Sequence, residues 1–340
     1  MNGVRFGAYH SYNDFHLILA KKTIGTPSPK KEVIEIPGGD GVLDLTEFFG
    51  GVKYGNRTLT FEFSTIRPQS EFMEIFSEVQ NAIHGKRMAI AIDDDPEWVY
   101  VGRISVSEWK AEKAVGRLTI DCDCEPFKRR ISSKPVKLTG RNLLNLNSLE
   151  AFALSSWTKT ATGYTYTRGT ETGGTFGYFT FPVKKGQQYI FSADYSSANN
   201  LLYVYKDRIF GTAVAISDGG KPCTFIAQEN GMYLFGLYII GTSNTGTFQN
   251  IMIQEGGTVG TYVAYETTQK TQTVTFNNKW RSAVPRIYLT GQMTIAKDAY
   301  NITRSTGIYT LSDFIFPQGD TTLTFTGIGY AVVEWTEGGM

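Results

Sequence analysis

The chain has 340 residues, of which 41% are hydrophobic and 19% are charged, a composition typical of a folded protein with two or three domains. Its 33 basic and 32 acidic residues nearly cancel, so the charge gives no reason to expect a nucleic-acid partner. All apolar runs are shorter than the roughly 18 residues of a membrane span, so no membrane partner is expected either.

The N-terminus and the cysteines indicate synthesis in a reducing compartment. Arg5, His10 and Asp14 interrupt the first apolar residues, which is unlike a secretory signal. The three cysteines, at positions 122, 124 and 223, are too few and too irregular for a disulfide framework. We therefore expect the chain to be made in a cytoplasm.

The first 130 residues are predicted to form strands around one helix. Residues 58–63 alternate between apolar and polar side chains, as a half-buried strand does. From Pro68 to His84 the apolar residues recur at helical spacing, and Gly85 suits the end of a helix. This apolar stripe consists of Phe72, Ile75, Phe76, Val79 and Ile83.

Two further patterns in this region bear on metal binding. The apolar runs on either side of residues 93–95 predict a hairpin whose acidic tip is solvated, because the spacing of a calcium loop is absent. In residues 117–127, Cys122 and Cys124 share the apolar face of an alternating strand. Their spacing is not that of a zinc site, so both are expected in a core.

Composition changes sharply between residues 141 and 267. This stretch holds only 16 of the 65 charged residues but 21 of the 46 aromatic residues, which indicates an inserted module of a different kind. Strand-like runs separated by Gly, Asn and Ser predict an antiparallel sandwich. These runs are residues 188–195, 201–205, 231–240 and 247–254, and the residues expected in its core are Tyr189, Phe191, Tyr233 and Phe235.

The C-terminal part resumes after Glu266 with another all-β unit. Five short strands are predicted, at residues 271–276, 286–291, 307–311, 322–325 and 331–335. The whole chain is therefore expected to be mainly β.

Little in the sequence supports catalysis. The three histidines lie in no recognisable catalytic setting, and no nucleophile elbow or phosphate-binding motif is present. Glycoside hydrolysis needs a pair of carboxylates separated in space by roughly 5 to 9.5 Å, a distance that the sequence does not give. The acids in the aromatic stretch are therefore candidates only because they are present. These acids are Glu150, Asp194, Glu229, Glu255 and Glu266. No enzymatic activity, metal or cofactor is expected.

Several motifs, in this order, resemble the N-terminal domain of the distal tail (Dit) proteins of long-tailed bacteriophages. They are IPGGDGVLDLT at residues 36–46, the helix after Arg67-Pro68, IDDDPEWVYVGR at residues 92–103 and the closing Glu125-Pro126-Phe127. Later motifs are similar to the galectin-like β-sandwich that ends those proteins. They are PRIYLTG at 285–291, GIYTL at 307–311, FPQGDTTLTF at 316–325 and VEWTEG at 333–338.

The resemblance implies a structural virion protein of the distal tail tip. Its N-terminal domains would form a hexameric ring, the hub of a tip or baseplate. Such a ring joins the tail tube protein and the tape-measure protein to the tail-associated hub protein, and often carries receptor-binding proteins. The implied domains are residues 1–132 for the ring domain, 133–140 with 268–340 for the galectin-like sandwich, and 141–267 for the insertion.

The end of the insertion, NIMIQEGGTVGTY at residues 250–262, is similar to the last strand and turn of carbohydrate-binding jelly-roll modules in phage tail proteins. This resemblance implies binding of a host cell-wall glycan during adsorption. Aromatic rings suit that task because they pack on the C–H face of a sugar ring. The candidate residues are Trp157, Tyr164, Tyr166, Tyr195, Tyr203 and Tyr205. A cell-wall hydrolase using Glu255 or Asp194, and a docking module for receptor-binding proteins, remain the alternatives.

Overall fold

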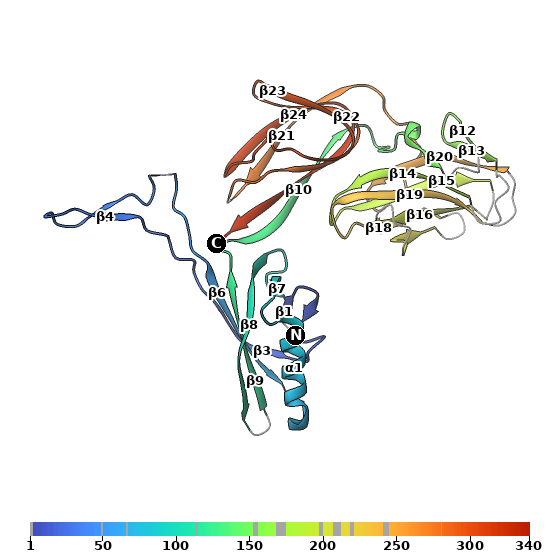
Figure 1. Cartoon of the computed structure of the whole chain (residues 1–340). Helices are drawn as coiled ribbons and strands as arrows, with labels where there is room; N and C mark the ends of the chain where they lie inside the picture. The colour runs from blue at the N-terminus through green and yellow to red at the C-terminus, as the bar shows by residue number, and fades with distance from the viewer. Residues whose placement is uncertain are drawn as a thin grey trace. The chain divides into compact units, whose positions relative to one another are not determined.

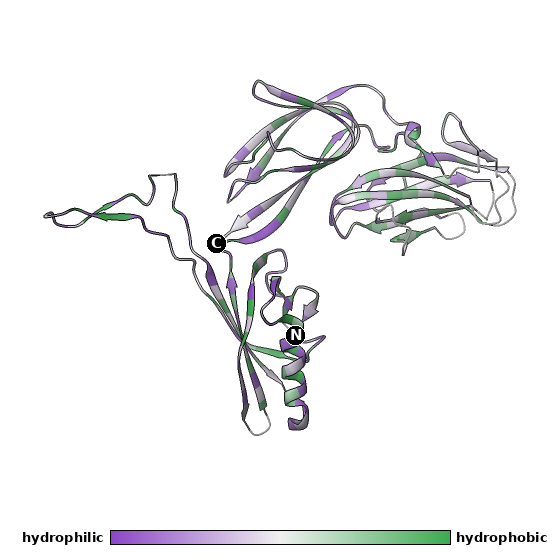
Figure 2. Cartoon of the chain, in the orientation of Figure 1, coloured by the Kyte–Doolittle hydropathy of each residue, from purple (hydrophilic) through white to green (hydrophobic). Residues whose placement is uncertain are grey.

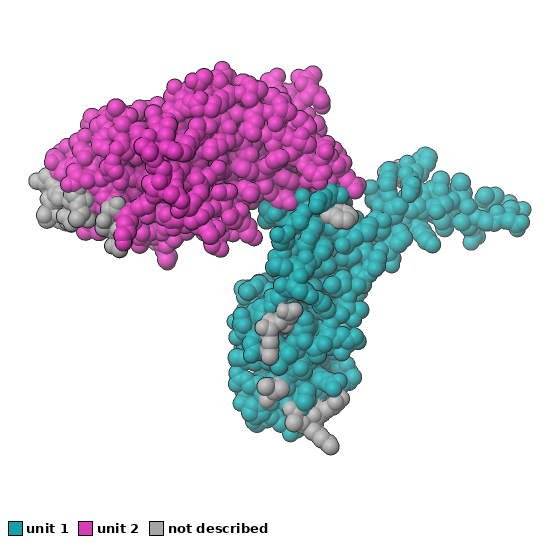
Figure 3. Space-filling view, turned by 180° about the vertical axis from the view of Figure 1, so that it is seen from behind, with its two compact units in different colours: residues 1–131, 279–281, 337–340 teal, residues 132–278, 282–336 magenta. Residues whose placement is uncertain are grey.

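The computed structural model describes residues 3–48, 50–65, 67–112, 115–151, 156–167, 175–196, 200–206, 212–217, 221–240, 245–279 and 281–340. These residues form antiparallel sheets and, within the described ranges, a single α-helix (Figure 1). The prediction of a mainly β chain is therefore confirmed. Two compact units divide the chain (Figure 3): residues 1–131, 279–281 and 337–340 form the first, and residues 132–278 and 282–336 form the second. The finer division into three domains stays a prediction.

The first unit is a sheet with one helix packed on it. Seven of its strands pair in the order β3-β6-β9-β8-β7-β1-β2. Helix α1 (Phe72–Ile83) follows the short 3-10 helix η1 (Gln69–Glu71) and buries one apolar stripe, so the helix prediction is confirmed. The strands are β1 (Val4–Phe6), β2 (Tyr9–His10), β3 (Ile18–Ile24), β6 (Arg57–Thr65), β7 (Arg87–Ile92), β8 (Val99–Glu112) and β9 (Val115–Cys124).

Cys122 and Cys124 lie in the core of this unit, as predicted. Burial raises the pKa of both thiols, to about 12 for Cys124, so both stay protonated at neutral pH. A protonated thiol is a poor metal ligand, because the thiolate is the form that binds. The two cysteines therefore act as small apolar core residues.

The acidic tip between β7 and β8 is a turn with Asp93 and Asp94 exposed, as predicted, and its three carboxylates also have partners within the unit. Asp93 accepts hydrogen bonds from the backbone N–H of Gly3 at 2.7 Å and from Nε2 of His10 at 3.0 Å. Burial alone would raise the pKa of Asp93, but these hydrogen bonds hold it below its usual value. Asp94 pairs with Lys22, and Asp95 with Lys128 at 2.6 Å. The tip is thus tied to other parts of its unit by ion pairs.

A long hairpin extends away from the other strands of the first unit (Figure 1). It is formed by β4 (Val33–Glu35) and β5 (Val42–Asp44), and the Gly-rich stretch between them makes the turn. All six strand residues are exposed although four of them are hydrophobic, as the green segments of the hairpin show (Figure 2).

The second unit contains the C-terminal strands and a separate two-sheet sandwich. The C-terminal strands are β21 (Lys270–Asn278), β22 (Arg286–Lys297), β23 (Tyr300–Thr310) and β24 (Gly319–Gly339), and β10 (Lys128–Leu138) pairs with β24. The prediction of five short strands here is wrong, because its last two form the single strand β24. Gly327 and Gly329, which look like a turn in the sequence, lie within β24, where β22 comes too close for a side chain.

Two five-stranded antiparallel sheets form what we call the central sandwich, as predicted. One sheet has the order β11 (Glu150–Ala151), β14 (Thr175–Val183), β19 (Gly231–Ile239), β16 (Asn200–Tyr205) and β17 (Ala215–Ile216). The other has the order β12 (Ser156–Lys159), β13 (Tyr164–Thr167), β20 (Thr245–Glu255), β15 (Gln188–Tyr195) and β18 (Cys223–Ile226). The four aromatic residues expected in its core are all buried there: Tyr189, Phe191, Tyr233 and Phe235.

The core of the central sandwich continues into the C-terminal strands. Tyr288, Tyr330 and Val332 belong to the same buried cluster, and the ring of Tyr330 stacks on Phe181 with centroids 5.1 Å apart. The sandwich is therefore packed against these strands through a shared core.

Candidate functional site

One sheet of the central sandwich carries aromatic rings on its outer face. Along β14, β16 and β19, alternate residues point into the core, and the residues between them face outward. Strand pairing brings the outward residues together, since Phe176 lies opposite Tyr238 and Tyr203 lies opposite Gly236. We call this set the aromatic platform: Phe176, Tyr178, Tyr203, Tyr205 and Tyr238.

The rings of the platform contact one another across three strands. Tyr203 and Tyr205 stack with centroids 5.9 Å apart, and Tyr203 meets Tyr238 edge-on at 5.3 Å. Phe176 lies 6.0 Å from Tyr238 and covers Gly236, where a Cβ atom would come within 2.3 Å of the Phe176 ring. The absence of a side chain at Gly236 is therefore what lets the rings form one continuous surface.

The platform also has polar edges. Burial raises the pKa of Tyr203 and Tyr205, and the neighbouring tyrosines raise it further by a smaller amount. Both hydroxyls therefore stay protonated at neutral pH. The Tyr178 hydroxyl donates a hydrogen bond to Oε2 of Glu150 at 2.9 Å. Half-buried rings bordered by hydroxyl and carboxylate groups suit a ligand with apolar faces and a polar rim.

The structure brings only two of the six predicted sugar-binding residues onto this platform, Tyr203 and Tyr205. The prediction that Tyr164 and Tyr166 lie on the surface is wrong, because both are buried in the sandwich core. Their hydroxyls point to protein partners, the carbonyl of Leu146 for Tyr164 and Oδ1 of Asn200 for Tyr166. The sequence around them is rich in turn residues and gives no signal for which face of β13 packs against the core.

Trp157 and Tyr195 pack against the core from the other sheet. The ring of Trp157 lies 5.7 Å from Tyr166 and 6.1 Å from Phe248. The Tyr195 ring lies 5.6 Å from Phe248, and burial raises the pKa of its hydroxyl to about 12. Neither residue contributes to the aromatic platform.

Sequence reasoning missed three platform residues, Phe176, Tyr178 and Tyr238. Their positions carried a usable signal, because even-numbered residues of β14 alternate with the core residues Phe179 and Phe181. The same alternation places Tyr238 on the outer face of β19, away from the core.

The two acids named for a hydrolase, Glu255 and Asp194, do not form a glycosidase pair. On β15 and β20, Glu255 lies opposite Tyr189, which is five residues from Asp194 along the strand. At about 3.4 Å per residue this separation is roughly 17 Å, beyond the reach of a glycosidase pair. The other three acids have partners: Glu150 accepts from Tyr178, Glu229 pairs with Lys206 and Glu266 pairs with Lys270.

The described residues contain neither a cluster of metal ligands nor a membrane-spanning helix. No group of three or more His, Cys, Asp or Glu side chains placed to hold a metal occurs in the described ranges. Across those same ranges, no helix is both long and apolar enough to pass through a membrane.

Comparisons with known proteins give distant similarities. No protein-family model matches the sequence, and no curated protein matches it. The chain is similar to the crystal structure of the SPP1 Dit (gp 19.1) protein, described as a paradigm of the hub adsorption apparatus in phages that infect Gram-positive bacteria, with 11% identity over 100% of both chains and a TM-score of 0.38. It is also similar to the Lactobacillus farciminis oxalate decarboxylase formate complex, with 10% identity over 57% of this chain and 86% of that one and a TM-score of 0.13. At these values neither structure bears on the function of this chain.

Proposed function

We propose that this chain is a structural component of a bacteriophage tail tip that forms a hexameric hub ring. The order of the motifs between residues 36 and 127 and between residues 285 and 338 supports this role. So does the hairpin of β4 and β5, whose exposed aliphatic side chains are typical of a surface that other chains cover. The partners would be the tail tube, tape-measure, tail-associated hub and receptor-binding proteins.

The central sandwich is proposed to bind glycans of the host cell surface through the aromatic platform. The observation that carries this proposal is the continuous surface of five rings on an outer sheet face. Aromatic rings exposed on such a face pack on sugar rings, whose hydroxyl groups stay solvated or bond to the platform edges. Six copies on one ring would raise a weak affinity by avidity, about 10² to 10⁴ in favourable geometry.

Replacing both Tyr203 and Tyr205 with Ala tests the glycan role. Each ring is expected to contribute on the order of 1 kcal/mol, so the double variant should bind purified host cell walls at least about tenfold more weakly. Binding is measured by co-sedimentation at a fixed ionic strength. Tyr300→Ala is the matched control, because Tyr300 is an exposed tyrosine of β23 outside the platform.

Equal binding by the double variant and by the unchanged protein would contradict the glycan role of the platform. Capture of another tail protein through Tyr203 and Tyr205, without glycan binding, would replace it with a docking role. Release of reducing sugar from the cell walls would contradict a purely structural function.

A further inference from the structure

A pocket of about 380 Å³ opens on the outer face of the second sheet of the central sandwich. Its walls come from β15, β20, the turn after β20 and Pro222, all of which the structure describes. Asp194, Asn250 and Ser192 supply polar groups, and Met252 and the ring of Tyr262 supply apolar surface. The volume lies within the range of small-molecule sites, roughly 300 to 1,000 Å³.

Local backbone irregularities shape this pocket. The pairing of β15 with β20 shifts register between Ser192 and Asp194, so a bulge re-aims the side chains of β15 at this point. Across from it, Asn250 has a φ of 53°, a left-handed conformation that is uncommon for a residue with a side chain. The Asn250 amide donates a hydrogen bond to Oδ2 of Asp194 at 2.5 Å. Carboxylate and amide are thus held side by side.

Hydrogen bonds to residues outside the pocket lining hold the turn that forms the opposite wall. The backbone N–H of Gly260 donates to Oε1 of Gln254 at 3.3 Å, and Arg141 donates to the carbonyl of Thr261. The Arg141 guanidinium packs against Gly260, where a Cβ atom would lie 2.9 Å from it. The pocket is therefore largely formed before a ligand arrives, which lowers the entropic cost of binding.

The polar groups of the pocket define the chemistry of its ligand. In the part of the chain that the structure describes, no lysine or arginine forms an ion pair with Asp194. Its carboxylate is an acceptor, and Asn250 offers an amide beside it. Burial raises the pKa of Tyr262, so its hydroxyl stays a neutral donor and acceptor. Adjacent hydroxyl groups match such a carboxylate and amide, whereas an anionic ligand meets an unpaired negative charge.

We infer that this pocket binds one uncharged sugar ring through neighbouring hydroxyl groups. The inference rests on the proposed glycan role of the central sandwich and adds a second site to it. The platform packs against the faces of an extended glycan, and the pocket takes a single ring with Asp194 and Asn250 on its hydroxyls and Met252 beneath it. The two sites lie on different sheets, so their variants act independently.

The test titrates the full chain with single sugars by calorimetry. The probes are the methyl glycosides of glucose, galactose and N-acetylglucosamine, with glucuronic acid as the anionic comparison. At least one neutral glycoside should bind, and Asp194→Asn should weaken it about tenfold or more, because hydrogen bonds to a charged group are the stronger ones. Tyr262→Phe, which keeps the ring and removes the hydroxyl, should weaken the same glycoside.

Two controls separate this pocket from the rest of the protein. Glu229→Gln removes an acid of the same sandwich outside the pocket and should leave binding unchanged. The Tyr203 and Tyr205 double variant should bind cell walls more weakly but keep its binding of the single sugar.

Glucuronic acid binding as tightly as the neutral sugars would overturn the inference, and so would an Asp194→Asn variant that binds like the unchanged protein. If no single sugar binds while cell walls still bind through the platform, the pocket inference fails and the proposed function stands. If neither sugars nor cell walls bind, both fail.

Discussion

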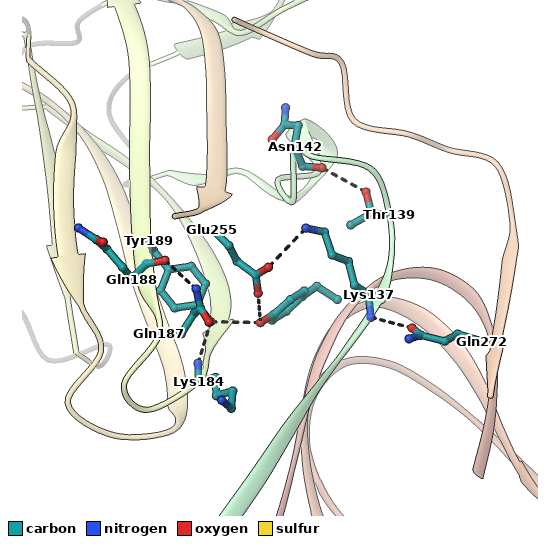
Figure 4. A network of polar contacts seen from close by, with 10 residues as sticks. Lys137, Thr139, Asn142, Lys184, Gln187, Gln188, Tyr189, Glu255 and Gln272 are labelled. Atoms are coloured by element: carbon teal, nitrogen blue, oxygen red, sulfur yellow. Dashed lines mark hydrogen bonds and ion pairs between the residues drawn. The ribbon is translucent and has the colours of Figure 1, made fainter. Parts of the chain in front are cut away.

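The Tyr330 hydroxyl joins two parts of the second unit through a directed chain of hydrogen bonds. The backbone N–H of Lys184 donates to the Tyr189 hydroxyl at 2.9 Å, and the two tyrosine hydroxyls lie 3.1 Å apart. Tyr330 donates in turn to Oε1 of Glu255 at 2.9 Å, and Lys137 pairs with the same carboxylate (Figure 4). Burial raises the pKa of both phenols, to about 12 for Tyr189, so both hydroxyls remain donors at neutral pH.

Tyr330→Phe should therefore destabilise the second unit more than the loss of one surface hydrogen bond. The variant leaves the buried hydroxyl of Tyr189 without its acceptor and removes a donor from Glu255, which costs about 1 to 3 kcal/mol. The midpoint of urea unfolding, followed by tyrosine and tryptophan fluorescence, measures this loss.

Tyr300→Phe serves as the comparison for that variant. The Tyr300 hydroxyl bonds to Oδ2 of Asp313 at 3.2 Å on an exposed strand, so its loss should change the midpoint little. Equal midpoints for both variants would mean that the buried chain of hydrogen bonds contributes nothing to stability.

At the scale of elements, β24 shows how a glycine pair keeps one long strand continuous. The strand pairs with β21 through residues 319–327 and with β22 through residues 324–334. Gly327 has a φ of 151°, and a Cβ atom there would lie 2.1 Å from the carbonyl oxygen of Gln292. Only glycine allows this approach of two backbones.

Gly327→Ala should lower the midpoint of thermal unfolding markedly or prevent folding. Gly319→Ala is the matched control, because Gly319 begins the same strand with a φ of 102° but has no atom within 4 Å of the position of its Cβ. Gly319→Ala then carries only backbone strain, about 1 to 3 kcal/mol, whereas Gly327→Ala adds a steric clash that costs a further 1 to 3 kcal/mol. A loss at Gly327 no larger than that at Gly319 would contradict this account of β24.

Helix α1 and strand β24 show where sequence reasoning succeeds and where it fails. Helix α1 was predictable because its apolar stripe lies within twelve consecutive residues and depends on no distant contact. The continuity of β24 was not, because Gly-Ile-Gly at residues 327–329 carries a turn signal that only the neighbouring strand cancels.

At the scale of the whole molecule, the proposed function requires that the chain associate with itself. The chain has a mass of 37.8 kDa, so a closed hexamer should sediment with about six times that mass. Negative-stain images of the purified protein should show an annulus with six-fold symmetry. Single subunits alone, at high concentration and with neighbouring tail proteins present, would contradict the ring.

The candidate site was only partly within reach of the sequence. Tyr203 and Tyr205 were identifiable as aromatic residues of one strand, but their partners Phe176 and Tyr238 come from strands before and after it. Which rings share a face follows from the register of three strands, and a shift of one residue would have exchanged core and surface. The pocket beside Asp194 depends on a bulge and on the turn at residues 259–262, which the alternation of side chains does not encode.

The sequence by itself determined the mainly β class, the helix after Pro68, the buried cysteines of β9 and the aromatic core of the central sandwich. Each of these follows from the spacing of apolar residues within one segment, because side chains alternate along a strand and recur every 3.6 residues along a helix. The tertiary structure alone decided that β24 is one strand, that Tyr164 and Tyr166 are buried, and that five rings meet on one sheet face. Those outcomes depend on contacts between residues far apart in the chain, and local spacing does not specify which strands become neighbours.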